Sequence, residues 1–152
     1  MTTKTQNQKP LLRDAEPADF EAIRALLATV NLPREGVQDR LDNFVVLLDG
    51  KKIIGTVGLE LYGTRALLRS LAVAKEYQGK GYGQQLYQAI VEKARQNQIS
   101  ELYLLTETAE KFFAARGFEK IAREEADPKV KTTMEFRSVC PQSAACMRLK
   151  LK

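Results

Sequence analysis

The feature that most constrains the fold is the stretch 67–94, where an apolar segment leads through a glycine-containing turn into an amphipathic helix. The run Leu67–Val73, interrupted by Arg69 and Ser70, predicts a buried strand. The first turn of the following helix has unpaired N–H groups, and the helix dipole adds partial positive charge there. Because glycines at 79–83 let a ligand approach the backbone, the stretch predicts an anion site in an α/β protein.

The glycine turn differs from two common phosphate-binding loops. The third glycine of GxGxxG would fall at Gln84, and no Gly-Lys-Ser/Thr follows as in a Walker A loop. The alternative to an anion site is a plain strand–turn–helix of an α/β protein. A length of 152 residues suits one globular domain. The formal net charge of +5 suits a phosphate-bearing ligand.

Composition excludes several classes of chemistry and partner. The chain has no histidine, which excludes His-based triads and His metal sites, and no metal is expected. Cys140 and Cys146 form no CxxC pattern and are expected to be buried, free thiols in a cytoplasmic protein. No apolar run has membrane-span length, and the basic residues are dispersed, so neither a membrane nor a nucleic-acid partner is expected.

Apolar periodicity and turn signals predict the order of the elements. Polar residues 1–9 are expected to be disordered, and 10–152 to form a single domain. Strands are expected at 11–14, 44–48, 52–62, 66–73, 99–105 and 118–122, and a final pair of strands or extended segments at 132–139 and 145–151. Helices are expected at 17–30, 81–96 and 108–116, with a short helix or turn at 37–41 and a loop-like segment at 124–131.

The connections predict how the strands pair. Asp49-Gly50 and Gly63-Thr64 signal hairpins, so the strands from 44 to 73 are expected to form an antiparallel meander. The strand 99–105 follows a helix and is expected to pair in parallel. Gly55 and Gly58 indicate a bulge or close packing. The expected fold is α/β (α+β), with a mixed, mostly antiparallel sheet of six or seven strands and about four helices.

Three segments resemble the GNAT (GCN5-related N-acetyltransferase) superfamily. LAV at 71–73 with Gln78, Gly81 and Gly83 matches its Q/R-x-x-G-x-G/A motif, YLLT at 103–106 matches a family strand, and AEKFFAARGF at 109–118 is similar to A-x-x-[FW]-[YF]-x-x-x-G-F. The element order is also the family's, so the resemblance covers about 10–152. It implies a sheet splayed between the strand before the glycine turn and the following parallel strand.

A narrower resemblance rests on GLE at 58–60, LLRSLAV at 67–73 and EFRSVCPQSAACM at 135–147. These segments look like small acetyltransferases encoded in bacterial arsenic-resistance operons. Those proteins are in turn similar to the acetyltransferase domain of N-acetylglutamate synthase. Trivalent arsenic seeks thiolates, but buried structural cysteines are the favoured interpretation of the two cysteines here.

The superfamily resemblance implies acetyl-CoA as the acetyl donor. Backbone N–H groups of 78–83 would hold the pyrophosphate, with charge from Lys80, while main-chain groups of Leu71 and Val73 would pair with the pantetheine. The Val73 N–H would polarise the thioester carbonyl. The expected cofactor-binding residues are Leu71, Ala72, Val73, Gln78, Gly79, Lys80, Gly81, Tyr82, Gly83, Thr106 and Phe113.

Glu60 is the candidate general base. Strand alternation places Glu60 and Tyr62 on one face, although a solvated carboxylate or an ion-pair partner for Arg69 is the alternative. Phe113 occupies the position where many family members have a proton-donating tyrosine, so the usual general acid is missing. The thiolate could leave to water, to a helix dipole, or to Tyr103, Tyr82 or Cys140. The catalytic candidates are Glu60, Val73 and Tyr103, and Phe112 is interpreted as core packing.

Arg69 points to an acidic acceptor. An arginine in an apolar strand needs a carboxylate partner, which is either Glu60 or a substrate. The resemblance implies that Arg137 and Ser138 bind a second carboxylate, and Ser70 and Thr106 complete the substrate-binding candidates.

The sequence thus predicts a cytoplasmic N-acetyltransferase, monomeric or homodimeric, that acts on a small, acidic, amino-acid-like amine by direct attack in a ternary complex. The alternatives are a peptide acceptor, a non-catalytic acyl-CoA sensor and, last, a basic nucleic-acid-binding protein.

Overall fold

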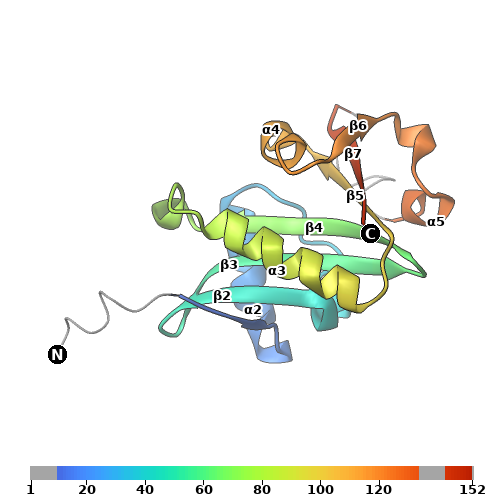
Figure 1. Cartoon of the computed structure of the whole chain (residues 1–152). Coiled ribbons are helices and arrows are strands. Elements are labelled where there is room, and N and C mark those ends of the chain that lie inside the picture. Colours follow the sequence, from blue (N-terminus) through green and yellow to red (C-terminus); the bar gives the residue numbers. More distant parts are fainter. Residues whose placement is uncertain (1–9, 134–142, 152) are drawn as a thin grey trace. The chain divides into compact units, whose positions relative to one another are not determined.

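A computed structural model describes residues 10–133 and 143–151 (Figure 1). The strands are β1 (Leu11–Asp14), β2 (Phe44–Asp49), β3 (Lys52–Tyr62), β4 (Arg65–Val73), β5 (Glu101–Thr106), β6 (Glu119–Ile121) and β7 (Ala145–Lys150). The α-helices are α2 (Phe20–Thr29), α3 (Tyr82–Gln96), α4 (Glu110–Ala114) and α5 (Pro128–Lys131). The 3-10 turns are η1 (Pro17–Asp19), η2 (Gln38–Asn43), η3 (Lys75–Tyr77) and η4 (Arg123–Glu125).

The seven strands of the described residues form one sheet in the order β1-β2-β3-β4-β5-β7-β6. β1 with β2, β2 with β3, β5 with β7 and β6 with β7 are antiparallel, whereas β4 and β5 are parallel. These pairings confirm the predicted mixed, mostly antiparallel α/β fold. The β4–β5 pairing covers Arg65–Leu67 of β4, which continues to Val73. The predicted splay of these two strands stays a prediction.

Contacts divide the chain into two compact units, and the first holds the chain up to Gly58 together with Ser70–Ile90. Here α3 crosses in front of β3 and β4, and α2 lies behind the sheet (Figure 1). Gly55 lies so close to α3 that an added Cβ would stand 2.8 Å from Leu86 Cδ1. A Cβ at Gly58 would meet the ring of Phe44. The close packing predicted for these two glycines is therefore confirmed.

The second unit holds Leu59–Arg69 and the chain from Val91 onward. Its core cluster consists of Leu67, Tyr103, Ala126, Val130 and Cys146, with Tyr62, Leu105 and Ile121 packed against it. Apolar residues from β4, β5, β7 and α5 thus meet around one centre.

The predicted elements are mostly present, with local corrections. Asp49 pairs with Lys52, so the first hairpin turns on Gly50-Lys51, one residue later than predicted, and Gly50 has a φ of +62°. The segment 124–131 was expected to be loop-like, but it contains the end of η4 and α5, where the Asp127 side chain accepts a hydrogen bond from the N–H of Lys129. This N-cap followed by Pro128 is a helix start signal.

Two further predictions need adjustment. Thr132 and Thr133, expected to begin a strand or extended segment, follow α5 in a turn and a bend, and the rest of 132–139 lies outside the described residues. The helix predicted at 108–116 is shorter, at Glu110–Ala114. By contrast, Leu86, Ile90, Val91 and Ala94 are buried on α3, which confirms the predicted apolar face. None of the helices described has the length and apolar character needed to cross a membrane.

Candidate active site

The glycine loop, residues 78–83, has a backbone that favours glycine at two positions. Gly79 and Gly81 have φ values of +82° and +87°, and an added Cβ at either would have nothing within 4 Å. α3 begins at Tyr82, and its first backbone bond runs from the N–H of Gln85 to the carbonyl of Gly81. Open space above the backbone at a helix N-terminus can receive phosphate groups. The residues present therefore fit the pyrophosphate of a CoA-type ligand.

Hydrogen bonds fix how β4 leads into the glycine loop. The N–H of Ala74 donates to the carbonyl of Ile54 at 2.8 Å, which attaches the end of β4 to β3. The Gln78 side-chain amide donates to the carbonyl of Val73 at 2.9 Å. Gln78 thus holds the turn by its side chain, in addition to the backbone role predicted for it. Lys80 is exposed, so its ammonium group is accessible to an anionic ligand.

The main chain predicted to pair with pantetheine lies in the last part of β4. Leu71 and Val73 are half-buried, and Ala72 between them is buried. This end of the strand, which leads into the glycine loop, is thus only partly exposed. The roles of these main-chain groups, including the Val73 N–H, stay predictions.

Ser70 has an unusual backbone conformation in the middle of β4. Its φ is +64°, in the left-handed region that non-glycine residues rarely adopt, and its side chain is buried. Leu68, Arg69 and Ser70 are buried in succession, so the strict alternation of the strand is interrupted. Backbone strain of this kind concentrates at functional sites. Ser70, predicted as a substrate-binding residue, thus lies where the alternation of the strand is interrupted, and no sequence signal indicates this.

Glu60 is held from both sides by its neighbours. Arg69 Nη1 donates to Glu60 Oε2 at 2.7 Å, and the Tyr62 hydroxyl donates to Oε1 at 2.5 Å. The Arg69 side chain is 0% exposed and that of Glu60 is 7% exposed. The structure thus decides between the two predicted partners of Arg69 in favour of Glu60, and it confirms that Glu60 and Tyr62 share a face.

This arrangement determines what the cluster of Glu60, Tyr62 and Arg69 can do. The guanidinium compensates the charge of the buried carboxylate, which would otherwise be costly. Each carboxylate oxygen accepts a hydrogen bond from one of these two neighbours. Glu60 is thus an oriented acceptor that can take a proton or a hydrogen bond from an amine. Tyr62 is half-buried, and the sequence assigned it no role. The available signal was its position two residues after Glu60, which places both side chains on one face of the strand.

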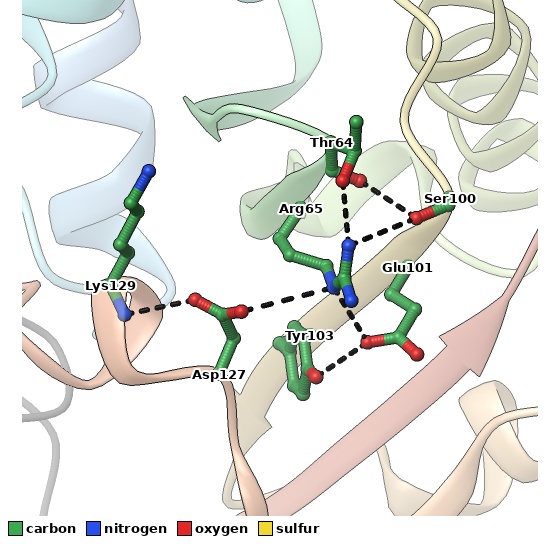
Figure 2. A network of polar contacts seen from close by, with 7 residues as sticks. All are labelled: Thr64, Arg65, Ser100, Glu101, Tyr103, Asp127 and Lys129. Atoms are coloured by element: carbon green, nitrogen blue, oxygen red, sulfur yellow. Dashed lines mark hydrogen bonds and ion pairs between the residues drawn. The ribbon is translucent and has the colours of Figure 1, made fainter.

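Tyr103 belongs to a different network, centred on Arg65 (Figure 2). Its hydroxyl donates to Glu101 Oε1 at 2.7 Å, and Arg65 Nε lies 3.0 Å from the same carboxylate oxygen. Burial, and then the hydrogen bond to Glu101, raise the pKa of Tyr103 above its usual range. A phenol with a raised pKa, whose proton is already hydrogen-bonded to a carboxylate, is a poor proton donor to a leaving thiolate. These contacts support a structural role and give no support to the proton-donor role predicted for Tyr103.

The same network attaches α5 to β4 and β5. Asp127 Oδ2 lies 3.8 Å from Arg65 Nε, and Ser100 and Thr64 complete the polar contacts around the guanidinium (Figure 2). The network therefore holds the segment before residue 134 in place. Arg137 and Ser138, predicted to bind an acceptor carboxylate, lie outside the described residues, as does Cys140.

The two adjacent phenylalanines of α4 exchange their expected places. Phe113 is buried and packs edge-to-face against Phe112 and Phe118, with ring centroids 5.1 and 5.4 Å away. Phe112, which was interpreted as core packing, is only half-buried, and the Arg116 guanidinium covers its ring at 3.5 Å. Successive helix positions diverge by about 100°, and on α4 it is Phe113 that faces the core. Phe113 is therefore a core residue, and its predicted cofactor contact stays a prediction.

Thr106 and Cys146 are both engaged in the fold. Thr106 Oγ1 accepts a hydrogen bond from the N–H of Ala109 at 2.9 Å and so shapes the turn into α4. Its predicted cofactor and substrate contacts stay predictions. Cys146 is a buried free cysteine, as expected, and burial raises the pKa of its thiol to about 11. The thiol is therefore protonated at neutral pH, which disfavours metal or arsenic ligation.

The element order, the parallel β4–β5 pair and the glycine loop are those of a CoA-dependent acetyltransferase fold. The family model described as "Acetyltransferase (GNAT) family" matches residues 9–118, which is more than half of the chain. The chain therefore belongs to the GNAT acetyltransferase family.

One curated relative is the amino-acid acetyltransferase of Neisseria meningitidis serogroup A, 28% identical over 123 residues. The match covers 75% of this chain and 28% of the relative, so the chain spans less than a third of that protein's length.

Two solved structures share the fold. The N-acetylglutamate synthase of Neisseria gonorrhoeae, complexed with coenzyme A and N-acetyl-glutamate, has a TM-score of 0.81 at 23% identity, covering 96% of this chain and 36% of that one. Rv2747 of Mycobacterium tuberculosis, solved in complex with CoA, has a TM-score of 0.76 at 23% identity, covering 94% of this chain and 100% of that one.

Proposed function

We propose that this protein transfers the acetyl group of acetyl-CoA to the amino group of a small, acidic, amino-acid-like molecule. The observation that carries the proposal is the layout of β4, in which the buried Arg69 and left-handed Ser70 are followed by the main chain that leads into the glycine loop. The similarity to an amino-acid acetyltransferase and to a synthase solved with N-acetyl-glutamate supports this acceptor class. A cytoplasmic location, and a monomeric or homodimeric state, belong to the same proposal.

The chain's own residues divide the work between cofactor and acceptor. Backbone N–H groups of residues 78–83 hold the pyrophosphate, with Lys80 adding charge, and the main chain of Leu71 and Val73 pairs with the pantetheine. Acetyl-CoA supplies the activated acetyl group when it is bound. The Val73 N–H donates to the thioester carbonyl as negative charge develops on that oxygen.

Glu60 accepts the proton that the acceptor ammonium must lose before the amine attacks. An α-amino group has a pKa of about 7.7–8.0, so only modest assistance is required. The C–N bond then forms as the C–S bond breaks, the attacking nitrogen gives its second proton to water, and the thiolate takes its proton from water. Arg69 and Tyr62 hold the two oxygens of Glu60 and so orient the base.

Recognition of the acceptor's carboxylate falls to Arg137 and Ser138. The Arg69 guanidinium is already paired with Glu60 inside the protein. Arg137 is therefore the arginine that we assign to a bidentate contact with the substrate carboxylate. The resemblance to acetyltransferases of arsenic-resistance operons motivates testing amino acids that contain arsenic. An acceptor of that kind would use the same base and the same carboxylate contact.

A spectrophotometric thiol-release screen tests the proposal. The panel contains L-glutamate, L-aspartate, neutral and basic amino acids, arsenic-containing analogues and a short peptide, each with acetyl-CoA. Saturable release with at least one acidic amino acid, and weak release with basic ones, is the expected result. Binding of CoA by titration calorimetry without release on any amine would instead indicate a non-catalytic acyl-CoA sensor. A preference for the peptide would overturn the small-acceptor assignment.

A further inference from the structure

The turn between β2 and β3 makes side-chain contacts with η3, the 3-10 turn immediately before the glycine loop. The Tyr77 hydroxyl donates to Asp49 Oδ2 at 2.6 Å. Lys52 Nζ lies 3.2 Å from Glu76 Oε2 and 5.6 Å from the centroid of the Tyr77 ring. Two residues of the hairpin therefore bind two consecutive residues of η3.

Tyr77 also contacts the other end of the glycine loop. Its ring centroid lies 6.4 Å from that of Tyr82, the first residue of α3. Its backbone N–H donates to the carbonyl of Ala74 at 2.8 Å. One side chain thus touches the hairpin and the helix start while its backbone closes η3, and all of these residues belong to the same compact unit.

We infer that Asp49 and Tyr77 are positioning residues for the cofactor, which hold the glycine loop in its binding conformation without contacting the ligand themselves. The inference rests on the proposed function of the glycine loop as the CoA site. Gly79 and Gly81 make this loop entropically expensive to order. A loop ordered before binding leaves less of that cost to be met by the ligand, so its affinity is higher.

The direction in which Asp49→Ala changes CoA affinity separates a positioning role from simple electrostatics. Asp49 is a carboxylate on the same unit as a site for a highly anionic ligand, so its charge alone opposes CoA binding. Removing that charge should then tighten binding. A positioning role predicts the opposite for Asp49→Ala, because the hydrogen bond to Tyr77 is lost together with the charge. Asp49→Asn keeps an acceptor oxygen and separates the two effects.

Titration calorimetry of the full chain with CoA itself, together with acceptor kinetics, tests the inference. Loss of one exposed hydrogen bond predicts CoA binding weakened by about three- to tenfold in Asp49→Ala and in Tyr77→Phe. The double variant should be no weaker than either single variant, since both remove the same bond. Asp49→Asn should bind CoA at least as tightly as wild type, and at saturating acetyl-CoA kcat and the KM for the acceptor should not change in any of the variants.

Asp42→Ala is the matched control, because Asp42 is an exposed carboxylate on η2, which precedes β2 at the opposite end of that strand from Asp49. Unchanged or tighter CoA binding in both Asp49→Ala and Tyr77→Phe, or additive losses in the double variant, would overturn the inference. Tyr77→Phe removes a single oxygen and keeps the test valid should Asp49→Ala fail to fold. A wild-type protein that does not bind CoA would refute the proposed function, whereas wild-type binding with unaffected variants refutes this inference alone.

Discussion

Replacing Arg69 by methionine should destabilise the protein strongly. Methionine keeps much of the side-chain volume and removes the guanidinium. Glu60, 7% exposed, then loses the cation that lies 2.7 Å from its Oε2. A buried charge left without its partner costs about 3–5 kcal/mol. Total folding free energies of domains are about 5–15 kcal/mol, so Arg69→Met should remove at least about a fifth of the stability and up to all of it in a marginal domain.

Urea unfolding followed by far-ultraviolet circular dichroism measures this loss at 25 °C. Arg95→Met is the matched control, since Arg95 is exposed on α3, and it should change the unfolding free energy by less than about 0.5 kcal/mol. Combining Arg69→Met with Glu60→Gln removes both charges and should recover part of the loss. A loss below about 1 kcal/mol for Arg69→Met, or a double variant whose losses simply add, would refute the buried-pair reasoning.

Three further perturbations test other parts of the structure. Gly58→Ala forces a Cβ against the buried Phe44 ring and should lower the unfolding free energy by about 1–3 kcal/mol in urea; an unchanged midpoint would contradict this packing. The hydrogen bond from Arg13 holds the pKa of Asp19 below its usual range, so this carboxylate stabilises the fold above a pH of about 3.9 and loses its effect as the pH falls. Asp19→Asn should flatten acid unfolding, and parallel curves would exclude that contribution. Burial of Cys146 predicts slow alkylation by iodoacetamide at pH 8 and fast alkylation in urea, read by mass spectrometry of its peptide; equal rates would argue against a buried thiol.

Local sequence signals were sufficient for the parts of the fold that depend on neighbouring residues. The Gly63-Thr64 turn between β3 and β4, and the apolar stripe of α3, are where the pattern predicted them. The parallel pairing of β5 followed from the helix that precedes it. The turn follows from a local residue preference and the stripe from a helical period, and tertiary packing overrides neither.

Features set by long-range contacts were not predictable in the same way. The left-handed backbone of Ser70 depends on how β4 is held by its neighbours, and nothing in its sequence context signals it. Tyr103 is committed to Glu101 because Arg65 brings that carboxylate into place from another strand. The choice of Phe113 over Phe112 for the core follows from how α4 packs, which residue type alone does not encode.

The candidate site was predicted in part. The partner of Arg69 was narrowed to two possibilities, and the structure selects Glu60 because the two side chains meet across adjacent strands. The contribution of Tyr62 was missed, since a half-buried tyrosine on a strand has many possible partners until the fold brings one carboxylate within reach. The Asp49–Tyr77 contact joins residues 28 positions apart in the chain and has no local signature.

The most direct test of the central claim compares kcat/KM for the best acceptor with the Kd of CoA in Glu60→Gln. Glu92→Gln is the control, because Glu92 is an exposed glutamate on α3. A positioned general base contributes about 10²–10⁴-fold, so Glu60→Gln should lower kcat/KM by at least about 100-fold while CoA binding stays within twofold of wild type. Wild-type turnover in Glu60→Gln, or a parallel loss of CoA binding, would contradict a role for Glu60 in activating the acceptor amine.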